Sequence, residues 1–371
     1  MKVMTVVGTR PEVIKLSRVI ARLDEMADHV LVHTGQNFDH ELNQVFFDEL
    51  GIRSPDHVLD VAGDGLASTV GNILTSTDAV FEHERPDALL VLGDTNSALC
   101  VLMAKRRRIP IFHMEAGNRC FDQRVPEEIN RKVVDHLSDV NMPYTEHARR
   151  YLLDEGLPPD RTIKTGSPQR EVIEYYRPLI EASDVLDRLD LEPSRYFVVS
   201  LHREENVDSP TNLALLVESV NEVAANYGLP VIVSMHPRTR LRLETAGHEF
   251  DPRVRPMAPL GLPDYLALQI NSRCTISDSG TITEESSMLG FPAVTVREAH
   301  ERPEGMDTGV VVMSGVGRER LLDAIELTIR QFETSGPPML PDDYSALDVS
   351  WKVCKIILSY TDYVNRVVWR K

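Results

Sequence analysis

The chain has 371 residues, a length that fits two domains of ordinary size. Its composition, 42% hydrophobic and 26% charged, is that of a soluble globular protein. The net charge of −17 argues against a nucleic-acid-binding protein and against binding to an anionic membrane surface, because both require a basic face. The first apolar segment is too short for a secretory signal, and no run of about 18 apolar residues occurs. We therefore expect a cytoplasmic protein without membrane contact.

The cysteine pattern gives no sign of a metal or disulfide framework. The 4 cysteines are widely spaced and form no Cys-x-x-Cys pair. His113 and Glu115 match the opening of a zinc deaminase signature, but the paired cysteines that complete it are absent. The sequence predicts that the protein binds no metal.

Buried strands and amphipathic helices alternate in the first half of the chain. Strands are predicted at Val3–Val7, His29–His33, Ala88–Leu92, Ile109–Phe112, Val140–Tyr144 and Thr162–Thr165. Helices are predicted at Pro11–Met26, Leu42–Leu50, Ser97–Lys105 and Pro126–Ser138. This alternation indicates a doubly wound parallel sheet.

The same alternation restarts after Ser194. Strands are predicted at Tyr196–Ser200, Pro230–Ser234, Cys274–Ile276 and Ala293–Val296. Helices are predicted around Asn212–Tyr227, Leu262–Ile270 and Glu284–Leu289, and a last helical pattern runs from Asp348 to Lys371. The fold class is therefore α/β, with two doubly wound Rossmann-like domains and a cleft where their carboxyl edges face each other. The last helix is too apolar to remain free, so we expect it to pack back on the body.

The turn after the first predicted strand is a candidate anion site. Pro11 at the first helical position fixes Arg10 at a helix N-terminus, beside free backbone N–H groups. A dinucleotide-binding fingerprint needs three glycines, whereas only Gly8 is present. NAD binding by the usual loop is therefore not expected.

Carboxylates and guanidinium groups gather where predicted strands of the first half end. The segment from His113 to Arg119 follows one buried strand, and the segment from Glu127 to Arg131 follows eight residues later. Asp94 ends the preceding strand. Ligands of parallel sheets bind at this edge. The alternatives are a surface ion-pair cluster and, for Asp94, an N-cap.

The second half has its own polar residues at strand ends. His202 and Arg203 follow one strand, and His236 and Arg238 follow the next. A buried histidine such as His236 is more often a structural hydrogen-bonding group than a catalyst. The turn Ser279-Gly280-Thr281 opens a helix, which is the form of a phosphate-binding turn.

One turn into that helix, Glu285 could accept hydrogen bonds from ribose hydroxyls. Arg302 adds a cation after another strand.

Taken together, these motifs resemble the non-hydrolysing UDP-N-acetylglucosamine 2-epimerase family. The motifs that carry the resemblance are Gly8-Thr-Arg-Pro-Glu12 with Lys15, Gly93-Asp-Thr95, Glu115-Ala-Gly117 with Arg119, Pro126-Glu-Glu128 with Asn130-Arg131, His202-Arg203, Ser277-Asp-Ser-Gly280 with Glu284-Glu285, and Glu301-Arg-Pro-Glu304. They occur in order from residue 1 to about residue 330.

The resemblance implies the glycosyltransferase-B arrangement, no cofactor and a homodimer. We expect a Rossmann-like domain at 1–168, a UDP-binding domain at 169–347 and a C-terminal helix at 348–371. The implied reaction removes the C2 proton of a UDP-N-acetylhexosamine while UDP leaves C1, and the resulting 2-acetamidoglycal and UDP then recombine on the other face.

Residue roles follow from the same resemblance. Asp94, Glu115 and Glu127 match the family's catalytic carboxylates, and His202 and Arg10 match positions near the diphosphate. The matches to the UDP-binding turn and helix are Ser279, Gly280 and Glu285. The remaining substrate-binding candidates are Lys15, Arg119, Arg203, His236, Arg238, Thr281 and Arg302.

Two segments, 112–124 and 359–366, resemble a branch that acts on modified UDP-sugars. That branch includes UDP-2,3-diacetamido-2,3-dideoxyglucuronate 2-epimerases and enzymes forming UDP-N-acetyl-L-fucosamine, both serving surface polysaccharide synthesis. A uronate would need an extra cation, for which Arg124, Arg238 and Arg240 are candidates. The alternatives are a hydrolysing 2-epimerase, a glycosyltransferase of the same architecture and a non-catalytic UDP-sugar sensor.

Overall fold

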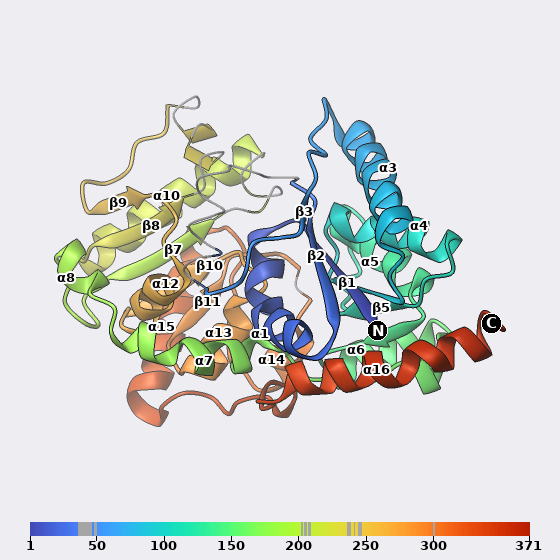
Figure 1. Ribbon diagram of the computed structural model, residues 1–371. Coiled ribbons are helices and arrows are strands. Elements are labelled where there is room, and N and C mark those ends of the chain that lie inside the picture. The colour runs from blue at the N-terminus through green and yellow to red at the C-terminus, as the bar shows by residue number, and fades with distance from the viewer. Residues whose placement is uncertain are drawn as a thin grey trace. The chain divides into compact units, whose positions relative to one another are not determined.

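The computed structural model of the chain is shown in Figure 1. It describes residues 1–35, 47, 50–201, 203, 206, 209–235, 239–240, 242–243, 247–299 and 301–371. The chain forms two compact units, which we describe separately. Unit 1 comprises Met1–Glu174 together with Asp343–Lys371, and unit 2 comprises Tyr175–Asp342.

Unit 1 is built on a parallel sheet of six strands, in the order β3-β2-β1-β4-β5-β6. The strands are β1 (Lys2–Val7), β2 (Asp28–His33), β3 (His57–Val58), β4 (Ala88–Leu92), β5 (Ile111–Met114) and β6 (Val140–Met142). The central strands are apolar runs buried on both faces, as expected when helices cover a parallel sheet. The strand order reverses between β1 and β4, which is where ligands bind in open α/β sheets.

Helices connect the strands of unit 1. They are α1 (Arg10–Met26), α3 (Leu66–Glu84), η1 (Asn96–Cys100), α4 (Val101–Arg106), α5 (Pro126–Leu137), α6 (Glu146–Asp154), η2 (Pro159–Arg161), η3 (Asp342–Tyr344) and α16 (Val349–Val367), while α7 (Gln169–Glu181) leads into unit 2. The amphipathic pattern of α1 places its apolar side on the sheet. In α5 the buried residues are Glu128, Arg131, Val134 and Asp135.

The C-terminal helix α16 lies along unit 1, as Figure 1 shows. It contacts α1, and the Arg22 guanidinium lies 4.0 Å from the centre of the Trp351 ring. The Ser350 amide donates to Glu171 at 2.8 Å, and Val353 and Ile357 are almost fully buried. Apolar burial and these polar contacts together hold the last helix on unit 1.

Unit 2 contains a second parallel sheet of six strands, in the order β12-β11-β10-β7-β8-β9. Its strands are β7 (Phe197–Leu201), β8 (Val231–Met235), β9 (Val254–Met257), β10 (Cys274–Ser277), β11 (Ala293–Thr295) and β12 (Val312–Met313). Its helices are α8 (Val185–Leu189), α10 (Pro210–Tyr227), α12 (Leu262–Ile270), α13 (Ile282–Leu289), α14 (Pro303–Asp307) and α15 (Arg318–Ser335). One large core of apolar side chains joins α10 and α15 to this sheet.

The predicted α/β class with two parallel sheets is confirmed. The prediction of a strand at Thr162–Thr165 is wrong, since only an isolated bridge joins Asn141 to Thr162. The segment runs beside β6 and donates to the carbonyls of Asn141 and Pro143, but Pro143 has no N–H to continue the pairing. The helix predicted at Ser97–Lys105 begins as the 3₁₀ turn η1. Most of the helix predicted at Leu42–Leu50 lies outside the described residues.

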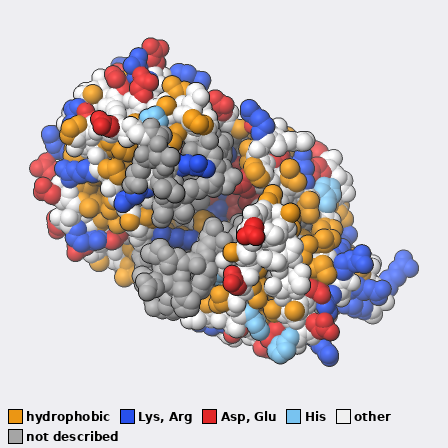
Figure 2. Space-filling model, turned by 90° about the horizontal axis from the view of Figure 1, so that it is seen from above, with side chains coloured by type: hydrophobic (Ala, Val, Ile, Leu, Met, Phe, Trp, Pro, Cys, Tyr) orange, Lys and Arg blue, Asp and Glu red, His pale blue; other side chains and the backbone are white. Residues whose placement is uncertain are grey.

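The described side chains on one face of the molecule are of mixed character. Figure 2 shows acidic, basic and hydrophobic side chains interspersed over the face seen from above. No described helix combines the length and apolar character needed to cross a lipid bilayer.

Candidate active site

The turn between β1 and α1 is closed by the side chain of Glu12. Its Oε2 accepts hydrogen bonds from the amides of Gly8 at 3.0 Å and Thr9 at 2.8 Å. Arg10 begins α1, as predicted from Pro11. The amides that the sequence offers as an anion site are therefore bound by a carboxylate of the protein itself.

Glu12 also links this turn to the end of β4. It is 2% exposed, and its Oε1 accepts a hydrogen bond from Thr95 Oγ1 at 3.0 Å. Burial raises the pKa of Glu12 to about 7, although the hydrogen bonds from Thr9, Gly8 and Thr95 oppose that shift. The Glu12 carboxyl group therefore titrates near neutral pH. Its hydrogen-bond partner Thr95 is the residue that follows Asp94 in the chain.

Asp94 follows β4 after Gly93, whose φ of +68° lets the chain turn at the sheet edge. Arg131 Nε donates to its carboxylate at 2.6 Å, and Asn130 Nδ2 donates to its backbone carbonyl at 2.9 Å. The half-buried Asp94 is thus held by α5, the helix that also carries Glu127. Asn130 and Arg131 belong to one of the sequence motifs, but the motif does not reveal that they bind Asp94.

Glu115 directly follows β5, the strand next to β4. Lys15 Nζ donates to its Oε2 at 2.7 Å, and Asn118 Nδ2 donates to its Oε1 at 3.3 Å. The backbone of Glu115 is left-handed, with φ of +63°, which is unusual for a residue other than glycine. A Cβ built on Gly93 would lie 3.9 Å from Glu115 Oε2, so this carboxylate lies close to the β4 turn that precedes Asp94.

The two glutamates that open α5 differ in their surroundings. Glu128 is 1% exposed and accepts hydrogen bonds from the Cys120 amide and from Arg131, both at 3.1 Å. Glu127 is half-buried. Glu128 therefore has a structural role at the start of α5, whereas Glu127 keeps contact with solvent.

Arg119, a predicted substrate-binding residue, lies inside unit 1. Its guanidinium donates to Glu155 at 2.7 and 2.8 Å and forms an ion pair with Asp135 at 2.7 Å. The Arg119 side chain is 0% exposed. We therefore leave Arg119 out of the groups proposed below to contact the substrate.

In unit 2, the end of β10 forms a compact polar turn. Asp278 is fully buried and accepts hydrogen bonds from the Arg203 amide at 3.0 Å and from Asn206 Nδ2 at 3.1 Å. The hydroxyls of Ser279 and Thr281 lie 3.0 Å apart. This turn leads directly into α13, as the phosphate-binding interpretation requires.

Charged side chains surround this turn. A Cβ on Gly280 would lie 3.4 Å from Glu301 Oε2 and 3.7 Å from the Arg203 guanidinium, so glycine keeps the turn close to both groups. Arg302 donates to Glu284 at 3.2 Å. Unit 2 thus brings Arg203, Gly280, Glu284 and Arg302 to one edge of its sheet.

Glu285 points its carboxylate toward α12. Its Oε2 accepts a hydrogen bond from Gln269 Nε2 at 3.1 Å, and both side chains are buried. Gln269 was not predicted as a site residue. The signal that could have found it is a polar side chain on the apolar face of α12, whose neighbours Leu266, Ala267 and Leu268 are buried.

Three predicted residues, His202, His236 and Arg238, lie outside the described residues. Arg240, a candidate for binding a uronate, is described and is exposed. The roles of the three residues stay predictions from the sequence.

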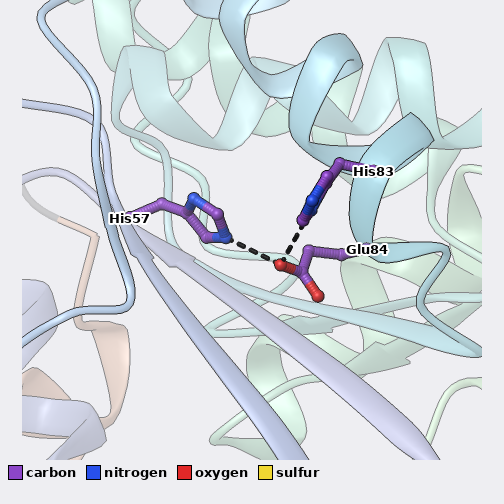
Figure 3. A group of neighbouring side chains, drawn as sticks. All are labelled: His57, His83 and Glu84. Carbon is purple, nitrogen blue, oxygen red and sulfur yellow. Dashed lines mark hydrogen bonds and ion pairs between the residues drawn. The ribbon is translucent and has the colours of Figure 1, made fainter.

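One group of described side chains has the composition of a metal site (Figure 3). His57 Nε2 and His83 Nδ1 approach Glu84 Oε1 at 2.9 and 3.2 Å, and Lys2 Nζ donates to Glu84 Oε2 at 2.9 Å. Hydrogen bonds from Lys2, then His57, hold the pKa of Glu84 at about 2. Because an ammonium already balances this carboxylate, hydrogen bonding accounts for the group, and we assign no metal to it.

A family described as UDP-N-acetylglucosamine 2-epimerase matches residues 21–358, which is most of the chain. The chain belongs to the UDP-N-acetylglucosamine 2-epimerase family. It is accordingly an isomerase acting on UDP-N-acetyl-sugars, as the motifs predict.

Two curated relatives of the UDP-N-acetylglucosamine 2-epimerase family show the range of substrate names. The UDP-N-acetylglucosamine 2-epimerase of Methanocaldococcus jannaschii is 32% identical over 342 residues, covering 89% of this chain and 93% of the relative. The UDP-2,3-diacetamido-2,3-dideoxy-D-glucuronate 2-epimerase of Pseudomonas aeruginosa is 33% identical over 335 residues, covering 89% and 92%. Sequence identity therefore does not separate the two substrates.

Solved structures agree with the family assignment. The UDP-N-acetylglucosamine 2-epimerase from Rickettsia bellii is 50% identical, with a TM-score of 0.91 and coverage of 100% of both chains. The M. jannaschii enzyme in complex with UDP-GlcNAc and UDP is 30% identical, with a TM-score of 0.91 and coverage of 97% and 100%. A Rickettsia africae glycosyltransferase at 10% identity and a TM-score of 0.56 shows only that the fold is shared.

Proposed function

We propose that this enzyme epimerises C2 of a UDP-N-acetylhexosamine without hydrolysis, by anti-elimination of UDP and re-addition. The observation that carries the proposal is the pair of carboxylates Asp94 and Glu115 at the carboxyl edge of the unit 1 sheet. Each lies against a cation, Arg131 and Lys15 respectively. Carboxylates held in this way are suited to moving a proton at a bound sugar.

The proposed step balances without a cofactor. A carboxylate takes the C2 proton, the C2–H electrons form the C1–C2 double bond, and the C1–O bond breaks to release UDP. UDP then adds to the 2-acetamidoglycal while a proton is returned to the opposite face of C2. The groups we assign to this proton transfer are Asp94, Glu115 and Glu127, with His202 and Arg10 kept as predictions near the diphosphate.

UDP recognition is assigned to unit 2. Ser279, Gly280 and Thr281 offer a small-residue turn at the start of α13, while Arg203 and Arg302 supply positive charge. Glu285, oriented by Gln269, is the proposed acceptor for the ribose hydroxyls. Donors placed at a leaving diphosphate are worth about 3 kcal/mol each to the transition state.

The sugar is either UDP-N-acetylglucosamine or a modified UDP-sugar, for cell-surface polysaccharide synthesis. A uronate would need an exposed cation near the acid–base groups. Arg124, in the loop between Glu115 and Glu127, has an 82% exposed side chain and forms an ion pair with Asp122 at 2.7 Å. The pairing with Asp122 reduces the charge that Arg124 offers, so the main support for both sugars is that relatives acting on each of them are similar to this chain.

The deciding experiment is proton NMR of the purified protein in deuterium oxide. The panel contains UDP-N-acetylglucosamine, UDP-2,3-diacetamido-2,3-dideoxyglucuronate and the precursor of UDP-N-acetyl-L-fucosamine. We expect deuterium at C2 of one intact UDP-sugar, with its epimer accumulating. Free sugar with UDP would establish the hydrolysing alternative instead, and binding without exchange would establish the sensor.

We also propose that the enzyme is a homodimer. Support comes from α5, where Ile129 and Val133 are 56% and 39% exposed, and from Leu102 of α4, which is 43% exposed. Helices α4 and α5 are in contact, and a contiguous exposed apolar patch marks a surface that another chain can cover. Light scattering after size exclusion should give twice the chain mass, and Ile129→Lys with Val133→Lys should give a monomer.

A further inference from the structure

A buried histidine and a buried aspartate bind backbone groups next to the two proposed carboxylates. His113, in the middle of β5, is 0% exposed, and its Nε2 lies at hydrogen-bond distance, 2.8 Å, from the Gly93 carbonyl. Its Nδ1 lies 3.0 Å from Asp135 Oδ1 of α5. The His113 ring on β5 thus contacts both the end of β4 and α5.

Asp135 is also 0% exposed and binds the turn after Glu115. The Gly117 amide donates to its two oxygens at 3.2 and 3.3 Å, and Arg119 pairs with Oδ2 at 2.7 Å. Burial alone would raise the pKa of Asp135, but His113 and Arg119 lower it below the usual value. Asp135 is therefore a carboxylate that can accept from several donors at once.

The residues held by this pair are the ones whose backbone needs support. Gly93, Glu115 and Gly117 all have positive φ, and Glu115 has a side chain that disfavours that conformation. A strained residue persists only where its surroundings fix it. His113 binds the carbonyl immediately before Asp94, and Asp135 binds the amide two residues after Glu115.

We propose that His113 and Asp135 form a positioning pair that sets the placement of Asp94 and Glu115 without touching the substrate. Nε2 must donate to reach a carbonyl, which only accepts. Nδ1 lies 3.0 Å from Asp135 Oδ1, a contact whose geometry is not that of a hydrogen bond. The effect of this pair on catalysis rests on the proposed function. Its effect on the placement of Asp94 and Glu115 can be measured without turnover.

Substitutions at His113 separate the two contacts of the ring. Gln reaches with an amide group to about the position of Nε2, whereas Asn reaches only to about that of Nδ1. His113→Gln should therefore keep the donor to Gly93, and His113→Asn should lose it. Asp135→Asn removes the charge while keeping an oxygen for the Gly117 amide.

Asp139, which lies between α5 and β6, provides a matched control at the other end of β5. It is 3% exposed and accepts from the Ile111 amide at 3.0 Å and from Lys105 at 2.5 Å, at the opposite end of β5. Asp139→Asn removes a buried aspartate charge that binds a backbone amide and a cation, as Asp135→Asn does. The melting temperature of Asp139→Asn should fall by about as much as that of Asp135→Asn.

The first measurement is turnover of the sugar found by deuterium exchange. We expect kcat to fall 10- to 100-fold in Asp135→Asn and His113→Asn, with KM within threefold of wild type. We expect His113→Gln to stay within about fivefold of wild-type kcat, and Asp139→Asn to stay unchanged. A kcat that follows the melting temperature across all four variants, or His113→Gln as slow as His113→Asn, would overturn the proposal.

The second measurement is amide hydrogen exchange of the peptide covering 113–120, which needs no turnover. Faster exchange of this peptide in Asp135→Asn and His113→Asn, but not in Asp139→Asn, is the expected result. Unchanged exchange refutes the pair even if the wild type epimerises. Conversely, the expected exchange pattern in a protein that transfers no C2 proton supports the pair and refutes only the proposed function.

Discussion

Lys15 of α1 and Glu115, the residue after β5, lie 100 positions apart in the chain and form an ion pair of 2.7 Å, with side chains 6% and 13% exposed. Removing one partner of such a pair leaves the other as an uncompensated, largely buried charge. The pair therefore ties the first helix of unit 1 to a proposed acid–base group.

Lys15→Met should lower kcat about 10- to 100-fold, because Glu115 loses the ammonium that holds it. The double variant Lys15→Met/Glu115→Gln should be no slower than Glu115→Gln alone, since the two groups act together. Steady-state kinetics of the four proteins give the coupling. Additive losses would show that Lys15 acts on the substrate independently of Glu115.

The three proposed carboxylates should be required for turnover and not for UDP binding. Asp94→Asn, Glu115→Gln and Glu127→Gln each remove one acid–base group and should reduce kcat by roughly 10²- to 10⁴-fold. Calorimetry should find UDP affinity within a few-fold of wild type. If any of the three loses UDP binding instead, that residue has a binding or folding role.

Glu12 should give the protein a stability component that falls as pH rises. Its folded pKa of about 7 lies above the ordinary value of 4.5, so the folded state holds the proton more tightly than the unfolded state. This component is fully present below about pH 4.5 and is lost as pH rises to about 7, by an amount on the order of 3 kcal/mol.

Urea unfolding of wild type and Glu12→Gln at pH 5 and pH 7.5 tests this. The amide is neutral at both pH values, so the variant should lack the decrease that wild type shows. Parallel pH dependence in the two proteins would mean that Glu12 titrates normally in the folded state.

Gly8 should not tolerate a methyl group. A Cβ there would lie 2.5 Å from Thr34 Oγ1 and would collide with the Ser97 hydroxyl, so Gly8→Ala should destabilise unit 1 by about 1 to 3 kcal/mol. Gly71, exposed in α3, has nothing within 4 Å of its Cβ position, and Gly71→Ala should keep or raise the melting temperature. Equal melting temperatures for the two variants would contradict the close approach of these three residues.

Glu285→Gln should weaken UDP binding about tenfold, equivalent to about 1.4 kcal/mol. The substitution removes the charged acceptor that Gln269 orients. Glu319→Gln, an exposed residue in the first turn of α15, is the control and should leave affinity unchanged. Calorimetry with UDP alone measures both, and an unchanged affinity in Glu285→Gln would remove the ribose contact from the proposal.

The sequence predicts the strands well because they are short apolar runs with clear breaks. Ala88–Leu92 is predicted with the bounds that the structure has. Helix α3 is missed because only a few of its residues, among them Ile73 and Phe81, are buried, which leaves a weak apolar pattern. Strands β3 and β12 are missed because two residues carry no period to detect.

The candidate site is only partly readable from the sequence. Asp94 and Glu115 can be placed at a sheet edge because each follows a buried strand directly. Their partners cannot be found this way, since Arg131 and Lys15 meet them only after folding. Asp135 has one usable signal, its place four positions after the motif residue Arg131, which puts both on the same face of α5.

The return of α16 to unit 1 affects the order in which the protein folds during synthesis. Unit 2 is one continuous stretch, whereas unit 1 needs the segment from Asp343 onward, which includes the helix that buries Val353 and Ile357. Unit 2 can therefore form its core from one continuous segment, whereas unit 1 needs two segments that are far apart in the chain. A chain truncated before Asp343 would contain all of unit 2 and a unit 1 in which the α1 surface that contacts α16 is exposed to solvent.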